Sequence, residues 1–283
     1  MITKEYSFHA PQKLEEAIAL LQHYGEDAKL LAGGVSLVPL MTLGLVQPEA
    51  LISLKHIREL DYVREAGDHL RIGAMTRHDR VRADSLIRQH CPVLAEAAGF
   101  IGDPQVRHRG TIGGSLAHAD PAADYPPVML VLNALLRIRN QNGERTVAAT
   151  DFFKGLLQTD LGRGEILTEV VVPKLAKGSG SAYRRLHRVE GSFAIVASAA
   201  VIEPGFKAAR VGLSGVGPKA VLLDVTRHLA GGVSDEALQA IARDTVEASA
   251  DAYGDLNGDA EYRREMAKVY AKRAIKAAAE ATT

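Results

Sequence analysis

Residues 111–124 (TIGGSLAHADPAAD) form the stretch of this chain with the clearest sign of a ligand site. The stretch begins with a hydroxyl residue and a glycine pair, continues through small residues, and ends in a carboxylate. It has too little apolar periodicity to predict an ordinary helix and too many small side chains to predict a packed strand. Small residues in succession let a backbone approach a ligand closely and direct N–H groups toward it. We therefore expect residues 111–124 to line a ligand site.

A second stretch of the same character, residues 32–36 (AGGVS), follows a short apolar strand expected at residues 29–32. Neither stretch has the Gly-x-Gly-x-x-Gly spacing of a dinucleotide fold or the Gly-Lys-Ser/Thr of a P-loop. One glycine pair alone indicates no more than a tight strand-to-helix turn. Two such stretches in one chain suggest a diphosphate held from both sides. Asp124 would then accept hydrogen bonds from a ribityl or ribose hydroxyl.

His118, Asp120 and Asp124 allow a different interpretation, as ligands of a non-haem metal ion. Such a site needs a second histidine, and the nearest in sequence, His108, lies upstream in a polar loop. Pro121 interrupts the segment, whereas metal ligands are more often carried by regular elements. We therefore predict no metal site.

The composition of the 283-residue chain restricts the class of protein, and its length favours two domains. Charged residues make up 24 % and the net charge is zero, which argues against a nucleic-acid-binding protein. No apolar run approaches the ~20 residues of a membrane-spanning helix. The N-terminus resembles no signal peptide, so a cytoplasmic location is expected. Cys91 is the only cysteine, which excludes an all-cysteine iron–sulfur cluster within the chain.

The pattern of apolar residues predicts an α+β chain whose domain boundary lies at the linker-like residues 177–181 (KGSGS). In the first part the expected helices are residues 14–21, 79–100 with a break at Pro92, and 128–132. Residues 35–43 should form a brief helical or turn segment interrupted at Pro39. The expected strands there are residues 29–32, 50–54, 62–65, 70–72, 135–139, 145–148 and 167–172. Two hairpins are expected, one between 62–65 and 70–72 and one between 135–139 and 145–148, where Asn142-Gly143 is a strong turn signal. In the second part we expect strands at residues 182–188, 193–202 and 207–213. Helices are expected at residues 218–229, 235–249, with Ser234 as the N-cap, and 261–280. The last helix should pack through one apolar stripe of Tyr262, Met266, Val269 and Tyr270.

Residues 32–41 (AGGVSLVPLM) followed by residues 103–115 (DPQVRHRGTIGGS) resemble the FAD-binding medium subunits of the molybdenum hydroxylases. This family includes xanthine dehydrogenase and aerobic carbon monoxide dehydrogenase. The likeness covers nearly the whole chain, including residues 73–76 (GAMT) and 165–167 (EIL).

The resemblance implies a two-lobed FAD-binding domain of the vanillyl-alcohol-oxidase type at residues 1–176, with lobes of about 1–55 and 56–176. It implies a C-terminal domain at residues 177–283, built from a three-stranded antiparallel sheet and a helical bundle.

The resemblance also implies residue roles. The FAD pyrophosphate would lie between residues 32–36 and 111–115, and the ribityl chain at Asp124. Ile101 and Leu167 match positions that line the adenine or dimethylbenzene region. The implied cofactor-binding set is Lys29, Leu30, Leu31, Ala32, Gly33, Gly34, Val35, Ser36, Ile101, Gly110, Thr111, Gly113, Gly114, Ser115, His118, Asp124, Leu167 and Arg184.

The resemblance also suggests residues near the flavin, and the sequence departs from the family pattern at two positions. Arg184 matches a basic position near the flavin, and Arg185 aligns almost as well. Phe193 falls where some relatives carry an aromatic residue close to the isoalloxazine. Ser115 stands where relatives have Asp or Asn, and Val35 where His is frequent. Because the glycines are kept, we expect FAD binding to be kept.

The resemblance implies an electron-transfer function without a catalytic residue in this chain, because the protein positions and tunes the cofactor. The substrate would be oxidised at a molybdopterin centre on a large subunit. Electrons would pass through two 2Fe-2S clusters on a small subunit to FAD and on to an external acceptor. The implied assembly is a dimer of heterotrimers. Two alternatives stay open: a stand-alone flavin oxidase or dehydrogenase with its own substrate pocket, and a non-enzymatic scaffold that has kept the fold.

Overall fold

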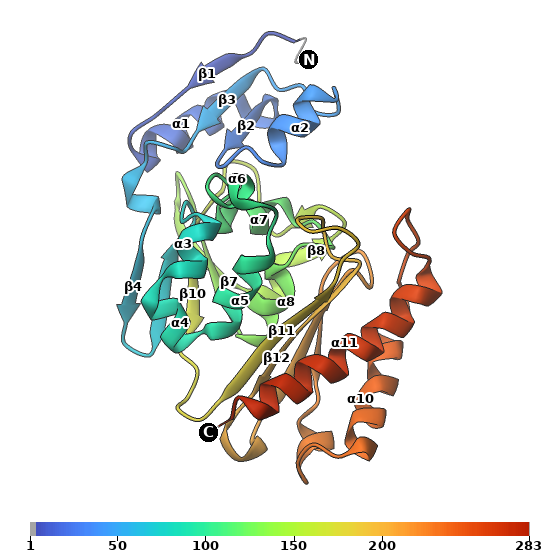
Figure 1. Cartoon of the computed structure of the whole chain (residues 1–283). Coiled ribbons are helices and arrows are strands. Elements are labelled where there is room, and N and C mark those ends of the chain that lie inside the picture. Colours follow the sequence, from blue (N-terminus) through green and yellow to red (C-terminus); the bar gives the residue numbers. More distant parts are fainter. Residues whose placement is uncertain (1–3, 283) are drawn as a thin grey trace.

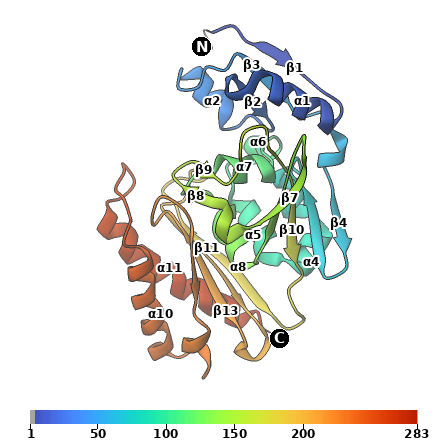
Figure 2. The same ribbon diagram turned by 180° about the vertical axis from the view of Figure 1, so that it is seen from behind.

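The computed structural model describes residues 4–282 and confirms the α+β class. Figures 1 and 2 show a small N-terminal lobe at one end, a second lobe in the middle, and a sheet with two long helices at the other end. Within residues 4–282, every helix is too short or too polar to cross a membrane.

The first lobe is a three-stranded parallel sheet in the order β1-β3-β2, covered by a predicted helix. Its core side chains, Leu14, Ala17, Ile18 and Leu21, follow the helical spacing seen in the sequence. The elements are β1 (Ser7–His9), α1 (Leu14–Tyr24), η1 (Gly25–Asp27), β2 (Ala28–Leu31), α2 (Leu37–Thr42), β3 (Ala50–Ser53) and η2 (Arg58–Leu60).

The second lobe is a five-stranded antiparallel sheet in the order β4-β5-β10-β6-β7, with helices packed on one face. Both predicted hairpins are confirmed, β4 with β5 and β6 with β7. The strands of this sheet are β4 (Val63–Ala66), β5 (His69–Gly73), β6 (Leu135–Asn140), β7 (Gly143–Ala148) and β10 (Ile166–Pro173). The short strands β8 (Phe153–Gly155) and β9 (Gln158–Thr159) pair with each other in a separate two-stranded sheet. The helices are α3 (His78–Ala83), α4 (Ser85–His90), α5 (Pro92–Phe100), α6 (Pro104–Arg107), α7 (Ile112–His118), α8 (Tyr125–Val131) and α9 (Ala149–Phe152).

The helical region of residues 79–100 has one more break than the sequence predicted. Pro92 begins α5 as expected, but a further break at Asp84 separates α3 from α4. Asp84 has an extended backbone, and its carboxylate accepts the N–H groups of Leu86 and Ile87. An aspartate in this role caps a new helix and ends the preceding one.

The C-terminal sheet has four strands in the order β11-β12-β13-β14, so the predicted three-stranded sheet is wrong by one strand. The strands are β11 (Gly180–Leu186), β12 (Val196–Ile202), β13 (Ala209–Ser214) and β14 (Val221–Asp224), with η3 (Pro204–Phe206) and η4 (Thr226–Leu229) between elements. The prediction of a helix at residues 218–229 is also wrong, because residues 221–224 pair along the edge of β13. A short apolar run can form either a helix or a strand. Here it forms a strand because the edge of β13 offers hydrogen-bond partners.

Helices α10 (Asp235–Ala248) and α11 (Ala260–Glu280) cover the outer face of this sheet (Figure 1). The predicted N-cap of α10 is confirmed, since the Ser234 hydroxyl accepts the Ala237 N–H at 3.1 Å. The predicted apolar stripe of α11 is right only in part: Met266 and Tyr270 are half-buried against the core, but Tyr262 is 41 % exposed. The buried face consists of Arg263, Ala267, Ala271, Ala274, Ile275 and Ala278.

Small side chains face the sheet on α11 because the helix backbone lies directly on β11. A Cβ added to Gly180 would come within 1.8 Å of the Ala278 carbonyl oxygen. Where helix and strand approach so closely, a small side chain such as that of Ala278 fits and a large one does not, so volume as well as hydrophobicity selects the mainly alanine face.

Strand β12 is buried on both faces. Ala197, Ala199 and Val201 pack into the core of the second lobe, against the layer that contains α5 and α8. Val196 and Ala200 pack on the opposite side, against α11. Since successive side chains of a strand point to opposite faces, one strand joins two cores.

We predict that Ala271→Leu destabilises the protein by about 1–3 kcal/mol, because the added methylenes overpack the interface between α11 and the sheet. Lys276→Leu places the same side chain on the exposed side of α11 and should change stability by no more than about 0.5 kcal/mol. Urea unfolding of both variants measures the difference, and equal midpoints would show that the alanine face is not tightly packed.

Candidate functional site

A cavity of about 620 Å³ lies where the first lobe, the second lobe and the loop of residues 191–193 meet. This volume is in the range of sites that hold cofactors. The cavity wall includes both glycine stretches, the end of β10 and Phe193.

Residues 33–37 form the part of the wall best suited to bind an anion. They connect β2 to α2, and all five line the cavity. Their five backbone N–H groups donate no hydrogen bond to any acceptor within residues 4–282. A run of free N–H groups ahead of a helix attracts negative charge, and a diphosphate is the cofactor group with matching acceptors. The cavity therefore fits a diphosphate-bearing cofactor on this side.

The glycines of this turn are required by a close approach of two backbones. A Cβ added to Gly33 would lie 2.2 Å from the carbonyl oxygen of Arg109. Gly34 has φ +77°, a left-handed conformation that favours glycine. The two glycine stretches, separated by more than seventy residues of sequence, thus meet at the cavity.

The other wall differs from the prediction, because residues 112–118 form a short helix, α7. Thr111 caps it, with its hydroxyl accepting the Gly114 N–H at 3.1 Å. The N–H groups of Ile112 and Gly113 donate to Thr76 and Ala74, each at 2.9 Å. The small residues serve helix packing here, since a Cβ on Gly113 would lie 2.5 Å from that of Ala74. The first turn of α7 therefore offers side-chain hydroxyls to a ligand rather than free backbone donors.

The segment after α7 turns back toward the cavity through Ala119, which has φ 52° and ends the helix in a left-handed conformation. His118, Asp120 and Asp124 all line the cavity. Asp120 caps the following turn by accepting the Ala122 N–H at 2.8 Å. Within residues 4–282 no three His, Cys, Asp or Glu side chains are grouped so that they could hold a metal ion.

Asp124 is a buried carboxylate held by the C-terminal sheet. Its Oδ1 accepts hydrogen bonds from Arg185 at 2.8 Å and from the Tyr183 hydroxyl at 2.5 Å. Burial raises the pKa of the Asp124 carboxyl, and the contacts with Arg185 and Tyr183 oppose that shift. Oδ2 takes no hydrogen bond from residues 4–282, although Asp124 lines the cavity. Arg185 continues to the Ser192 carbonyl at 2.6 Å, next to Phe193.

Nearly all of the predicted cofactor-binding residues line this one cavity, and the exceptions are Leu31 and Arg184. Leu31 is paired within β2, where its carbonyl accepts the Leu54 N–H. The Arg184 side chain is paired with Glu96 at 2.6 Å. Between the two arginines that the resemblance left open, Arg185 is the one connected to the cavity, through Asp124. Direct contact with a cofactor stays a prediction for every residue of the set.

The sequence did not identify several residues of the wall. They come from separate segments that only the fold brings together, and they include Met75, His78, Leu157, Leu161, Glu165, Gly191 and Ser192. A partial signal existed for four of them. Met75 and Glu165 lie in the stretches 73–76 and 165–167 that carry the resemblance, and Gly191 and Ser192 repeat the small-residue character of the other loops beside Phe193.

His78 supports the wall from inside the second lobe. Its ring lies against Gly110, where an added Cβ would be 2.6 Å from Nε2. Its Nδ1 lies 3.0 Å from the Tyr125 hydroxyl, and its backbone N–H donates to the Gly110 carbonyl at 3.0 Å. Burial lowers the pKa of His78 to about 4. The ring is therefore neutral at physiological pH.

We predict that His78 makes the protein acid-sensitive. Because its pKa falls from 6.5 to about 4 on folding, the unfolded chain binds a proton more readily between these values. The free energy of unfolding should therefore fall as the pH drops through this window, by up to about 3 kcal/mol from this residue. Urea unfolding at pH 7 and pH 4.5 should show a smaller loss for His78→Gln than for the wild type. Identical losses would show that His78 does not titrate in this way.

Comparison with known proteins agrees with this geometry. Residues 4–175 match the family described as the FAD binding domain in molybdopterin dehydrogenase. Residues 181–278 match the CO dehydrogenase flavoprotein C-terminal domain.

The chain is 41 % identical to the carbon monoxide dehydrogenase medium chain of Hydrogenophaga pseudoflava, over 98 % of both chains. It is 33 % identical to the 6-hydroxypseudooxynicotine dehydrogenase complex subunit alpha of Paenarthrobacter nicotinovorans, over 95 % of this chain and 93 % of that one.

Among solved structures, carbon monoxide dehydrogenase from Hydrogenophaga pseudoflava, in a form that lacks the Mo-pyranopterin moiety, superposes with a TM-score of 0.95. The identity is 40 %, and all of both chains is covered. The fold, the cavity and these matches agree that the chain belongs to the family of FAD-binding medium subunits of the molybdopterin-dependent hydroxylases.

Proposed function

We propose that residues 33–37 bind the diphosphate of FAD through their backbone N–H groups, with the Ser115 hydroxyl on the opposite wall. The observation that carries this proposal is the run of five N–H groups without an acceptor within residues 4–282, on the wall of the cavity. The helix α7 contributes less than the resemblance implied, because its first N–H groups are already bonded.

Asp124 is proposed to bind the ribityl chain through Oδ2. Both protein donors use Oδ1, so Oδ2 keeps its capacity to accept a hydroxyl. Ile101 and Leu167 would lie against the apolar ends of the cofactor, since both line the cavity. Phe193, which is 58 % exposed, would cover the isoalloxazine.

The rest of the electron path is proposed to lie on other chains. A 2Fe-2S cluster of the all-cysteine kind needs four thiolates. This chain has one cysteine, Cys91, which is buried, and burial raises its pKa to about 12. When bound, FAD supplies the chemistry that takes up electrons singly and releases them in pairs.

We infer that the chain works in a complex with a small 2Fe-2S subunit and a large molybdopterin subunit, as a dimer of heterotrimers. The proposal rests on the cysteine content and on the relatives, which are named as a medium chain and as a subunit of a complex. A division near residue 176 into an FAD-binding and a C-terminal domain, and a cytoplasmic location, stay predictions. The names of the relatives differ in substrate, so the substrate of the complex stays open.

We predict that Ser36→Asp weakens FAD binding by at least about tenfold, because a carboxylate would face the diphosphate at a separation where like charges repel by ~1–4 kcal/mol. Ser36→Asn is the matched control, since it has the same shape without the charge. Ser36 is the N-cap of α2 and makes no side-chain cap bond, and both replacements are good N-caps, so both should fold. Fluorescence titration of cofactor-free protein with FAD measures the affinity. Equal affinities for the two variants would contradict the diphosphate assignment.

We also predict that the isolated chain carries FAD but oxidises no substrate. Neither carbon monoxide nor 6-hydroxypseudooxynicotine should bleach its flavin absorbance. Co-expressed with molybdopterin and 2Fe-2S subunits, the same chain should show bleaching by the substrate of the complex. Turnover by the isolated chain would favour the stand-alone flavin oxidase, and failure to take up FAD would favour the scaffold.

A further inference from the structure

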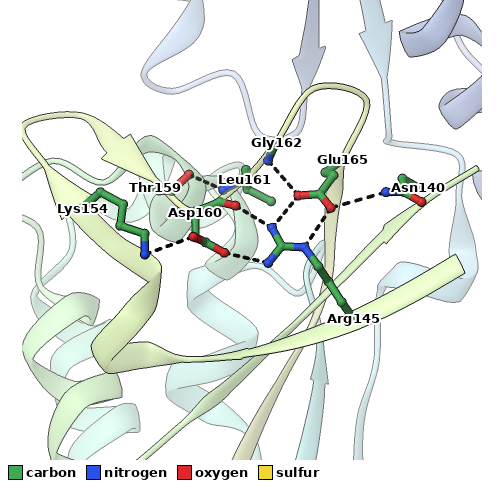
Figure 3. A network of polar contacts seen from close by, with 8 residues as sticks. All are labelled: Asn140, Arg145, Lys154, Thr159, Asp160, Leu161, Gly162 and Glu165. Carbon is green, nitrogen blue, oxygen red and sulfur yellow. Dashed lines mark hydrogen bonds and ion pairs between the residues drawn. The ribbon is translucent and has the colours of Figure 1, made fainter. Parts of the chain in front are cut away.

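Arg145 of β7 holds together two acidic residues that are separated from it in sequence (Figure 3). Its Nε and Nη2 donate to the two carboxylate oxygens of Glu165 at 2.8 and 2.6 Å. Its Nη1 donates to the Asp160 carboxylate at 2.6 Å, and Nη2 also reaches the Asp160 carbonyl at 2.5 Å. The planar guanidinium therefore uses its fork on one carboxylate and its remaining edge on the other.

The two acidic residues are the ends of a loop, residues 160–165, that connects β9 to β10. Inside the loop, the Gly162 N–H donates to the Glu165 carboxylate at 2.7 Å. Lys154 pairs with Asp160 from the outer side at 3.0 Å. Figure 3 shows Arg145 beneath this loop, with its side chain pointing between Asp160 and Glu165.

The same region forms one wall of the cavity. Leu157, Leu161 and Glu165 line it, and so do Ile166 and Leu167, which follow directly in β10. Leu157 has φ 54° in the turn between β8 and β9 and is 51 % exposed, so local packing holds it weakly. The place of this wall therefore depends on how the loop is anchored.

Arg145 also balances charge at the cavity. Glu165 is almost buried, with a side chain 8 % exposed, and the hydrogen bonds from Arg145 lower its pKa. An ionised carboxylate on the wall repels an anionic ligand unless a cation is paired with it. Within the loop network, two cations, Arg145 and Lys154, match two anions, Asp160 and Glu165.

The loop makes further contacts. The Asp160 N–H donates to the Phe152 carbonyl at 2.8 Å, and the Asn140 side-chain amide donates to the Glu165 carboxylate at the longer distance of 3.4 Å. Another contact reaches the first lobe. Arg163 pairs with Glu26 at 2.7 Å, but both side chains are more than 70 % exposed. An exposed ion pair contributes little. Arg145 is thus the main polar anchor of the loop.

We propose that Arg145 is a positioning residue of the FAD site, which fixes residues 157–165 as a wall of the cavity by binding Asp160 and Glu165 together. The proposal rests on the FAD site proposed above. Without Arg145, the leucines of the wall lose their fixed place and must be ordered again when the cofactor binds, which weakens affinity.

The test compares full-length Arg145→Met, Arg145→Lys and Arg139→Met with the wild type. Arg139→Met is the matched control: Arg139 lies on the neighbouring strand β6, is 39 % exposed against 40 % for Arg145, and makes an ion pair with Glu15 instead. FAD affinity is measured by fluorescence titration, and the flavin environment by visible circular dichroism. Hydrogen–deuterium exchange of residues 156–165 is measured in the cofactor-free protein.

We expect Arg145→Met to raise the Kd for FAD about tenfold, to change the circular dichroism, and to speed exchange in residues 156–165. Arg145→Lys, which keeps the charge but not the fork, should fall between Arg145→Met and the wild type. Arg139→Met should keep the wild-type Kd and exchange. Asp160→Asn is a milder change outside the cavity wall. It should shift the Kd for FAD and the exchange rate in the same direction, and it replaces Arg145→Met in the test if that variant does not fold.

Wild-type affinity and exchange in Arg145→Met would overturn the proposal, and so would equal effects of Arg145→Met and Arg139→Met. If the wild type itself bound no FAD, the proposed function would fail as well. Unchanged exchange in the cofactor-free Arg145→Met protein would contradict the anchoring role alone.

Discussion

The contact between the backbone of Gly33 and that of Arg109 and Gly110 is the constraint on which the cavity depends. It joins the first lobe to the second with no side chain between them, since a Cβ on Gly33 would come within 2.2 Å of a carbonyl oxygen. Two consequences follow from one steric fact. The lobes are held at a fixed separation, and residues 33–37 keep free N–H groups where the two lobes meet. Gly33 is therefore required for the close packing of the two lobes, and not only for the approach of a ligand.

The C-terminal sheet extends this arrangement into the cavity. Arg185 of β11 links the Asp124 carboxylate to the Ser192 carbonyl, so one buried guanidinium connects the acidic end of residues 111–124 to the loop that carries Phe193. Arg263 of α11, the helix on the outer face of the sheet, donates to the Ile195 and Gly215 carbonyls. Both arginines are almost fully buried, and each satisfies backbone carbonyls that a loop would otherwise leave unpaired. The cavity wall is therefore built partly by residues of the C-terminal part.

The sequence predicted what depends on local pattern. The helix α1, both hairpins of the second lobe and the cap at Ser234 follow from spacing and from turn chemistry, and all are present. It failed where tertiary contacts decide. Residues 221–224 form a strand because β13 has an edge to pair, and the buried face of α11 is mostly alanine because β11 lies so close. These outcomes depend on partners that are distant in the chain.

The residues of the site also fall into those that a local pattern predicts and those that only tertiary contacts bring to the cavity. The glycine stretches, Asp124 and Leu167 were found from motifs and from a resemblance that those motifs carry, and the cavity brings them together. His78 could not be found so, because a single histidine has no local signal, and Glu165 was noticed only as part of residues 165–167, with no role assigned to it. Their places follow from Gly110 and Arg145, which are more than fifteen residues away in sequence.

The double burial of β12 has a consequence for how the chain can be divided. Ala197, Ala199 and Val201 belong to the core of the second lobe, while their neighbours belong to the core under α11. A fragment that began after residue 176 would present the first set to water as a continuous apolar surface, prone to self-association. The boundary between the two family matches therefore separates two stretches of sequence but not two independent folding units, and truncated versions of this protein would not be expected to behave as autonomous domains.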